Sequence, residues 1–469
     1  MIKWVFSQLL LLLLFLSKHG FSRHIVKNLP GYSGQLPFTL EAGYISVGDS
    51  EIFYTFVESQ GNPREDPVIL YLTGGPGCSG FHSFFYQSGP LQFTTYIADG
   101  VPGLSLYPYA WTKMASIIYI DAPVGAGFSY VRNSGKLTVS DSKAGYEIHM
   151  FARKWFSEHP EFSKNSFYIL GDSYAGMYAP LTASHIVNGN RAGLLPQINL
   201  AGVVGGSPFT DEFLHANDKV EMSHRLGLIS DEVYESATKN CNGDYVHVDY
   251  SSNRPCFEDV KAVNESIADI NVENVVLPNC WFLTSKSNLK EARRFLQQKP
   301  TNILPPHNSI LDPDFCADTI LLHELAQMWA NNEKVQDALH VRKGKVKEWM
   351  RCNITYITDV YKYDIESVVD YHRNLTKEGL RVLIYGGDHE TLVSYYSTLQ
   401  WIRSLDLTLE SAWRPWSVDG QTAGYTLKYK NSEYRLTYAT LKGGGHSPTE
   451  TNRKDCYEMF ERWIHSRPL

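Results

Sequence analysis

The chain has 469 residues, of which 43% are hydrophobic and 20% charged, the composition of a globular protein with one large domain or two ordinary ones. Its formal net charge is -7 and its pI is about 6.2. Because this balance is acidic and the sequence contains no long basic run, we expect neither nucleic acid nor an anionic membrane surface as a partner.

Residues 1–22 are predicted to be a secretory signal peptide. An early lysine precedes an apolar stretch over residues 9–16, and Gly20 and Ser22 supply small residues where signal peptidase cleaves. This stretch is too short to span a bilayer, and no later stretch reaches about 18 continuous apolar residues, so we expect no membrane association after cleavage. A retained membrane anchor is the alternative. The mature chain would begin near Arg23 and reside outside the cell or in a vacuole.

Cysteines and glycosylation sequons agree with a secretory protein. No two cysteines form a C-x-x-C pair, so we predict neither a metal site nor a cofactor. Asn264, Asn353 and Asn374 each begin an N-x-[ST] sequon, as in surface loops of secreted glycoproteins. Three disulfides and one free thiol are expected, with the pairing open at this point, among Cys78, Cys241, Cys256, Cys280, Cys316, Cys352 and Cys456.

The first part of the chain predicts an α/β sheet. Residues 51–57 alternate apolar and polar side chains, which indicates an antiparallel strand at a sheet edge. The runs at residues 68–73 and 117–121 are almost wholly apolar and end in glycine-rich loops, which indicates parallel strands buried on both faces. We assign residues 23–210 to this core. Its further expected elements are a helix over 146–159, a strand over 166–170, a helix to about 187 and a strand over 200–204.

Residues 211–330 interrupt this alternation. They are polar, hold four of the seven cysteines and include a proline-rich stretch at residues 299–306, so we expect a cap inserted over the site. Residues 331–469 resume the core pattern. The elements expected there are a helix over 365–377, a strand over 380–385, hairpin strands over 425–430 and 434–441, and a final helix ending at 464.

The sequence around Ser173 is typical of a nucleophile elbow. A short apolar strand precedes it, a helical segment follows, and its neighbours Gly171, Ala175 and Gly176 are small. In such an elbow the serine sits on a tight turn that exposes its hydroxyl, and bulky neighbours would block it. The strict G-x-S-x-G pattern has glycine where Ala175 stands. A serine in an ordinary strand-to-helix turn is the alternative.

A serine nucleophile requires a base and an acid that orients the base. His446 ends a Gly-Gly-Gly-His motif after the last hairpin strand, in a loop that we expect to be flexible enough to bring the imidazole to Ser173. Asp388 and Glu390 follow the strand at residues 380–385 and are the two candidate acids. The resulting order of nucleophile, acid and histidine is that of α/β hydrolases.

Two backbone amides are expected to stabilise the oxyanion. They belong to Gly75, in the first glycine-rich loop, and Tyr174, directly after the nucleophile. The glycine-rich loop is not interpreted as a phosphate cradle, because it contains a proline and lacks the Gly-Lys-[Ser/Thr] ending.

These motifs resemble those of the plant serine carboxypeptidase-like proteins, in order and spacing from about residue 29 to residue 469. The resemblance implies an α/β-hydrolase fold, with a central, mostly parallel sheet and a largely helical cap insertion. It also implies the disulfides Cys78–Cys352, Cys241–Cys256 and Cys280–Cys316, and a free Cys456. The motifs are Thr-Gly-Gly-Pro-Gly-Cys-Ser at 73–79, Asp-Ala-Pro-Val-Gly-Ala-Gly-Phe-Ser-Tyr at 121–130, Gly-Asp-Ser-Tyr-Ala-Gly at 171–176, Gly-Asp-His at 387–389 and Gly-Gly-Gly-His at 443–446.

The sequence departs from the family at the acid and at the substrate-binding positions. Glu390 stands where the family has its catalytic aspartate; glutamate serves as the acid in other α/β hydrolases, and Asp388 is the fallback acid. Family peptidases bind the terminal carboxylate of a peptide with an asparagine and two glutamates. The residues matching this subsite, together with the adjacent glycine, are Thr73, Gly74, Gln87 and Asp172.

Asp172 resembles the acyltransferase branch of the family, which moves acyl groups from 1-O-glucose esters to hydroxyl or amine acceptors. We therefore expect an acyl-transferring enzyme with Ser173, His446 and Glu390 as its triad and small-molecule acyl donors and acceptors as its partners. A serine carboxypeptidase acting on peptide C-termini is the first alternative. A binding protein on an inactive hydrolase fold is the second, and Glu390 is its main support.

Overall fold

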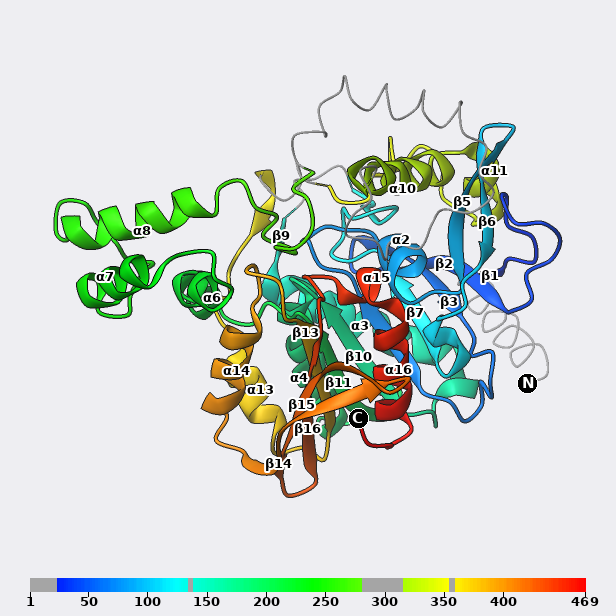
Figure 1. Cartoon of the computed structure of the whole chain (residues 1–469). Coiled ribbons are helices and arrows are strands. Elements are labelled where there is room, and N and C mark those ends of the chain that lie inside the picture. Colours follow the sequence, from blue (N-terminus) through cyan, green and yellow to red (C-terminus); the bar gives the residue numbers. More distant parts are fainter. Residues whose placement is uncertain (1–22, 134–137, 281–314, 354–358) are drawn as a thin grey trace, which may run out of the picture.

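The computed structural model describes residues 23–133, 138–280, 315–353 and 359–469 (Figure 1). The predicted signal peptide lies outside the described residues, as does the proline-rich stretch at residues 299–306. Within the described residues no helix is long and apolar enough to cross a membrane.

A large mixed sheet forms the centre of the molecule, and its middle strands run parallel. Leu70 pairs with Ile118 on one side and Ile169 on the other. Consecutive side chains of one strand serve opposite faces: Leu70 joins one apolar cluster, and Ile69 and Tyr71 join another. Burial on both faces explains the continuous apolar runs. In spatial order the parallel strands are β7 (Ser116–Ile120), β4 (Val68–Leu72), β10 (Phe167–Asp172), β11 (Leu200–Gly206), β13 (Arg381–Gly387) and β16 (Tyr434–Leu441).

Antiparallel strands flank this centre on both sides. The strand predicted at residues 51–57 and the hairpin of residues 425–441 are both present. The terminal strand β14 (Thr408–Val418) was not predicted, because it is a largely exposed edge strand that contains Pro415 and lacks regular apolar alternation. The other flanking strands are β1 (Arg23–Ile25), β2 (Leu40–Val47), β3 (Ser50–Val57) and β8 (Tyr130–Val131) on one side, and β15 (Gln421–Asn431) on the other.

Helices cover both faces of the sheet (Figure 1). On α3 (Asp141–Glu158) the side chains Ala144, Ile148, Phe151 and Trp155 recur at helical spacing and are fully buried or nearly so. The apolar cluster of that face also includes residues of α4 (Ala175–Arg191), α13 (Val369–Leu375) and α14 (Tyr395–Ser404). The opposite face packs against α2 (Gly80–His82), α10 (Phe315–Ala330) and α16 (Arg453–Ile464).

Helix α13 is shorter than predicted, because the chain before it is bonded to another segment. The backbone N–H of Val368 donates to Thr210, and the N–H of Glu212 donates to the carbonyl of Glu366. Residues 365–368 therefore lie alongside residues 210–212 and do not form a helical turn.

Between β11 and residue 338, the described residues form helices in two separate parts. Helices α6 to α8 share a small apolar cluster of their own and project from the core (Figure 1), whereas Leu321, Leu325 and Trp329 of α10 join a cluster of the main sheet. The predicted boundaries at residues 210 and 330 stay a prediction. The helices are α5 (Glu212–Asn217), α6 (Lys219–Arg225), α7 (Asp231–Cys241), α8 (Arg254–Ser266), α10 and α11 (Glu333–Ala338).

Short elements complete the described chain. They are a hairpin of β5 (Leu91–Ala98) and β6 (Val101–Leu106), a parallel pair of β9 (Val139–Ser140) and β12 (Tyr361–Lys362), the short helices η1 (Ser83–Gln87), η2 (Trp111–Lys113) and η3 (Pro160–Phe162), and α15 (Pro448–Thr451).

Three disulfides form the pairs that the resemblance implies: Cys78–Cys352, Cys241–Cys256 and Cys280–Cys316. Cys456 is a buried free thiol. The first disulfide ties the glycine-rich loop after β4 to a segment far along the chain. Of the sequon asparagines, Asn264 and Asn374 are exposed and Asn353 is partly buried.

Candidate active site

Ser173 lies on a tight turn between β10 and α4, at the carboxyl edge of the parallel strands. Its φ of 57° is in the left-handed region, which a non-glycine residue rarely adopts. Its N–H donates to the carbonyl of Gly206, and its own carbonyl accepts from Phe209. Gly171 is needed for the turn because a Cβ there would lie 2.2 Å from the carbonyl oxygen of Ala175. The structure thus places a half-buried serine hydroxyl in the predicted elbow.

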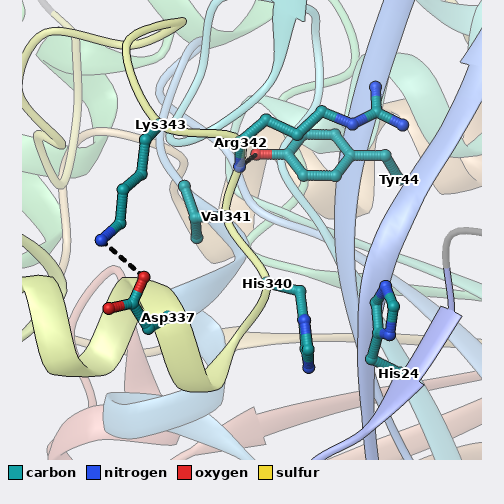
Figure 2. Close-up of a pocket in the computed structure, with 7 residues that line it drawn as sticks. All are labelled: His24, Tyr44, Asp337, His340, Val341, Arg342 and Lys343. Carbon is teal, nitrogen blue, oxygen red and sulfur yellow. Dashed lines mark hydrogen bonds and ion pairs between the residues drawn. The ribbon is translucent and has the colours of Figure 1, made fainter.

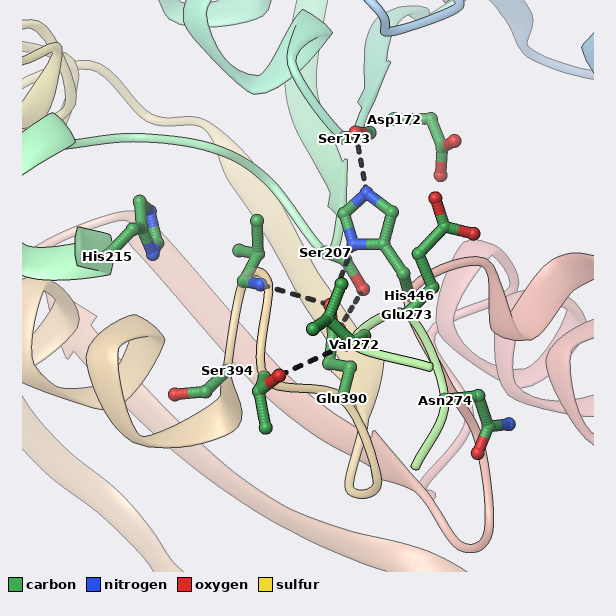
Figure 3. Close-up of polar contacts among 12 residues, drawn as sticks. Asp172, Ser173, Ser207, His215, Val272, Glu273, Asn274, Glu390, Ser394 and His446 are labelled. Atoms are coloured by element: carbon green, nitrogen blue, oxygen red, sulfur yellow. Dashed lines mark hydrogen bonds and ion pairs between the residues drawn. The ribbon is translucent and has the colours of Figure 1, made fainter. Parts of the chain in front are cut away.

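His446 and Glu390 form a continuous chain of contacts with Ser173 (Figure 3). The Ser173 Oγ lies 2.6 Å from Nε2 of His446, and Nδ1 of His446 lies 2.7 Å from Oε2 of Glu390. A carboxylate only accepts hydrogen bonds, so in the neutral imidazole Nδ1 carries the proton and Nε2 is free to accept the serine proton. The three residues follow β10, β13 and β16, whose parallel carboxyl ends meet at one edge of the sheet.

The electrostatics around His446 favour its protonated form. Burial alone would lower the pKa of this imidazole, but the charge of Glu390 and its hydrogen bond to Nδ1 outweigh burial and raise the pKa above its usual value. The charges of Glu273 and Asp172 act in the same direction. A base held in this way is a strong proton acceptor for a serine hydroxyl.

The loop that carries His446 is held in place by hydrogen bonds and packing, in contrast to the flexible loop that we expected. The Asp388 carboxylate accepts a hydrogen bond from the N–H of Gly443, and the N–H of His446 donates to the carbonyl of Glu273, 2.6 Å away. A Cβ at Gly445 would lie 2.4 Å from that same carbonyl oxygen. The glycine is thus required by a crossing segment, and flexibility does not explain it.

Asp388, the fallback acid, does not contact the catalytic imidazole. Its carboxylate lies 2.5 Å from Nδ1 of His389 and 2.7 Å from the amide nitrogen of Gly443. Of the two candidate acids, Glu390 is therefore the one that the structure brings to His446.

The glycine loop that carries one predicted oxyanion amide, that of Gly75, lies against the elbow that carries the other, that of Tyr174. A Cβ on Gly74 would lie 2.7 Å from Cβ of Ser173 and 2.8 Å from the amide nitrogen of Tyr174, so the glycine loop rests directly on the elbow. Within the described residues, neither the N–H of Gly75 nor that of Tyr174 has a hydrogen-bond acceptor. Both are available to a developing oxyanion, as such a site requires.

The residues predicted to bind substrate are bonded to their neighbours. Gln87 donates to the Asp172 carboxylate over 2.9 Å and accepts from the Tyr71 hydroxyl, and the Thr73 hydroxyl lies 2.7 Å from that of Ser83. Burial raises the pKa of Asp172 to about 6, although the bond from Gln87 lowers it in part. One Asp172 oxygen, Oδ1, is buried with no hydrogen-bond partner in the described residues.

Sequence reasoning missed two parts of this site. Ser207, directly after β11, donates a hydrogen bond to Glu390 over 2.7 Å. Residues 272–275 bond to both the acid loop and the loop of His446. The N–H of Thr391 donates to the carbonyl of Val272, the N–H of Val275 donates to the carbonyl of His389, and the N–H of His446 donates to the carbonyl of Glu273. No sequence motif marks either one. Ser207 follows a predicted strand, which was the one available signal.

A surface pocket of about 360 Å³ lies apart from these residues (Figure 2). His24 of β1 stacks on His340 there, with ring centroids 3.7 Å apart. Its Arg342 is bonded to Glu51 and its Lys343 to Asp337. The pocket shares no residue with the Ser173 site. In the part of the chain that the structure describes, no group of three or more His, Cys, Asp or Glu side chains could hold a metal ion.

Comparison with known proteins agrees with this geometry. The chain is 41% identical over 474 residues to serine carboxypeptidase-like 19 of Arabidopsis thaliana and 42% identical over 465 residues to serine carboxypeptidase-like 7 of the same plant, with 98% or more of each chain covered. Among solved structures, the prohormone-processing carboxypeptidase of Saccharomyces cerevisiae superposes with a TM-score of 0.67 over 91% of both chains at 18% identity, which shows the shared α/β-hydrolase fold. The serine carboxypeptidase family profile matches residues 30–466, and the chain is therefore an enzyme that belongs to the serine carboxypeptidase family.

Proposed function

We propose that this enzyme works through an acyl-enzyme on Ser173, with His446 as base and acid and Glu390 as the orienting carboxylate. The observation that carries this proposal is the unbroken contact chain of 2.6 Å from Ser173 to His446 and 2.7 Å from His446 to Glu390. Such a chain activates a serine hydroxyl regardless of the sequence positions of its members. The same chain argues against an inactive binding protein.

Each group has a definite part in the reaction. Ser173 Oγ attacks the acyl carbonyl while its proton passes to Nε2 of His446, and Glu390 stabilises the resulting imidazolium. The amides of Gly75 and Tyr174 stabilise the negative oxygen. His446 then protonates the oxygen of the leaving group, which departs and leaves the acyl group on Ser173. In the second half, His446 takes a proton from the acceptor as the acceptor attacks the acyl carbonyl, and it returns that proton to Ser173 Oγ as the bond from Ser173 to the acyl group breaks.

We propose acyl transfer from 1-O-glucose esters to hydroxyl or amine acceptors as the reaction. The arrangement of Thr73, Gln87 and Asp172 supports this choice over peptide cleavage. One N–H of the Gln87 amide donates to Asp172, the Thr73 hydroxyl is paired with that of Ser83, and Asp172 is negative above about pH 6. A peptide carboxylate placed there would meet this like charge, which is unfavourable.

Carboxypeptidase activity is the second candidate, and the raised pKa of Asp172 favours it in acid. Below about pH 6 the side chain becomes a neutral hydrogen-bond donor, and its unpaired Oδ1 is then able to donate to a carboxylate. This reaction would use the same triad. Acid favours this contact with the substrate, whereas His446 must be neutral to act as the base, so the rate would be highest between the pKa of Asp172 and the raised pKa of His446. The disulfides and sequons support a vacuolar or extracellular location.

Product analysis would distinguish the two reactions. The purified mature protein is incubated with acyl glucose esters plus hydroxyl and amine acceptors, and separately with blocked dipeptides, at pH 5 and pH 7. We expect mass spectrometry to detect a new ester or amide. Release of free amino acid without any transfer product would establish the peptidase instead. Lack of both reactions, together with no labelling of Ser173 by a fluorophosphonate, would favour a binding protein.

A further inference from the structure

The carboxylate of Glu390 is completely buried and held at both oxygens (Figure 3). Oε2 accepts from Nδ1 of His446 over 2.7 Å and from the N–H of Val393 over 3.1 Å. Oε1 accepts from the hydroxyl of Ser207 over 2.7 Å. Within the described residues Ser207 is the one hydrogen-bond donor to Oε1, so it determines how the carboxylate plane is turned toward His446.

Glutamate needs such a partner more than aspartate does. Its additional methylene moves the carboxylate about 1.5 Å further from the backbone and adds a rotatable bond. A carboxylate that turns about this bond loses its alignment with Nδ1, and the imidazole then loses its orientation. The Val393 contact is also on Oε2, so it does not fix the other oxygen.

The backbone of Ser207 is held in the position that this contact requires. Its φ of 36° is positive, its N–H donates to the carbonyl of Tyr385 over 2.7 Å, and the side chain is 1% exposed. Gly386 leaves the space between the two strands open, since a Cβ there would lie 3.2 Å from Ser207 Oγ and 3.6 Å from Glu390 Oε1. A serine, the shortest hydroxyl side chain, fits this space opposite a long acid.

We propose that Ser207 is a positioning residue of the triad and that Ser207 and Glu390 form a length-matched pair. The short donor directly after β11 compensates for the long acid after β13, so that a glutamate presents Oε2 to His446 as the orienting carboxylate. This inference rests on the proposed acyl-enzyme function. It assigns Ser207 no contact with substrate.

The first test is Ser207→Ala, measured as the second-order rate of Ser173 labelling by a fluorophosphonate. Loss of a hydrogen bond to a buried carboxylate is expected to slow labelling by about 10- to 100-fold. Ser116→Ala is the matched control. Ser116 is also fully buried and accepts a hydrogen bond from the N–H of Ser59, but it begins β7, at the end of the parallel strands away from the active site. We expect the control to label at the wild-type rate even if its melting temperature falls as much as that of Ser207→Ala.

The decisive test exchanges the lengths of the two side chains. Glu390→Asp alone and Ser207→Asn alone should each slow labelling by about 10- to 100-fold, because one leaves a gap and the other overfills the space. The double variant restores the combined length, and asparagine tolerates a positive φ. We expect it to label within about 10-fold of wild type, a coupling that independent sites do not show.

A second readout follows the pairing itself. The proton on Nδ1 of His446 should give a far-downfield NMR signal that is lost or shifted in Ser207→Ala and recovered in the double variant. Three results would overturn the inference: Ser207→Ala labelling like wild type, Glu390→Asp labelling like wild type, or a double variant no faster than Glu390→Asp. If wild-type protein itself is not labelled, the proposed function fails, and that outcome is distinct from these three.

Discussion

The two sides of the active site are held in different ways. On the nucleophile side, Ser173 and the oxyanion amides are fixed by close backbone contacts, such as Gly74 against the elbow. On the imidazole side, Glu390 accepts a hydrogen bond from Ser207, and the N–H of His446 donates to the carbonyl of Glu273, so both are held by residues far away in the sequence. Both sides therefore depend on long-range contacts, but glycine motifs in the sequence mark the nucleophile side, whereas no motif marks Ser207 or residues 272–275 on the imidazole side.

Removal of the nucleophile should have the largest effect. Ser173→Ala deletes the atom that forms the acyl-enzyme, so we expect turnover to fall by roughly 10⁶-fold and fluorophosphonate labelling to disappear. Turnover of the preferred acyl ester, measured on protein with an unchanged circular dichroism spectrum, checks this. Acyl transfer that survives in the variant would mean that another residue is the nucleophile.

Glu390→Gln should have the next largest effect, roughly 10⁴-fold on kcat, because an amide can donate to Nδ1 and select the wrong tautomer of His446. The residual activity also reports the electrostatics. The base acts when neutral, so activity rises with pH through the His446 pKa, which Glu390 raises. Without that charge the pKa falls, and the rise should move to lower pH. A profile of kcat/KM against pH that does not move would contradict this assignment.

These two sides also explain what sequence analysis was able to predict. The elbow has glycines at fixed positions and a strand-to-helix pattern, so Ser173, Tyr174 and Gly75 were identified from adjacent residues. Glu390 and His446 were identified because they follow predicted strands. Sequence analysis missed Ser207, residues 272–275 and the close packing of the Gly443–Gly445 run. Their contacts are made by backbone carbonyls and a single hydroxyl to distant parts of the chain, and such contacts leave no periodic pattern in the sequence.

Variants of the Gly443–Gly445 run test whether close packing or backbone flexibility is the reason for its glycines. A Cβ at Gly445 would collide with the Glu273 carbonyl, whereas a Cβ at Gly443 meets nothing within 4 Å and is disfavoured only by its φ of 71°. We expect Gly445→Ala to slow Ser173 labelling by about 10- to 100-fold through displacement of His446. Gly443→Ala should cost about 1 kcal/mol of stability with little change in rate. Equal rate losses in the two variants would favour a flexible loop instead.

Asp172 directly precedes the nucleophile, and its negative charge helps to raise the pKa of His446. Replacement of Asp172 should have the smallest effect of these changes, and we expect it in the free energy of unfolding. The pKa of Asp172 is about 6 in the folded protein, above the usual 3.8 of an aspartate, so the folded state binds more protons than the unfolded chain between these values. The wild-type free energy of unfolding therefore loses about 2 kcal/mol from this residue as pH rises from about 4 to 7. Asparagine does not titrate. The free energy of unfolding of Asp172→Asn should therefore rise by that amount, relative to wild type, over the same pH interval. Urea denaturation of both proteins at pH 4 and pH 7 measures the change, and the effects of groups that do not interact with Asp172 cancel in the difference. An unchanged difference would mean that Asp172 stays ionised throughout, and acid would then not make it the donor that a peptide carboxylate requires.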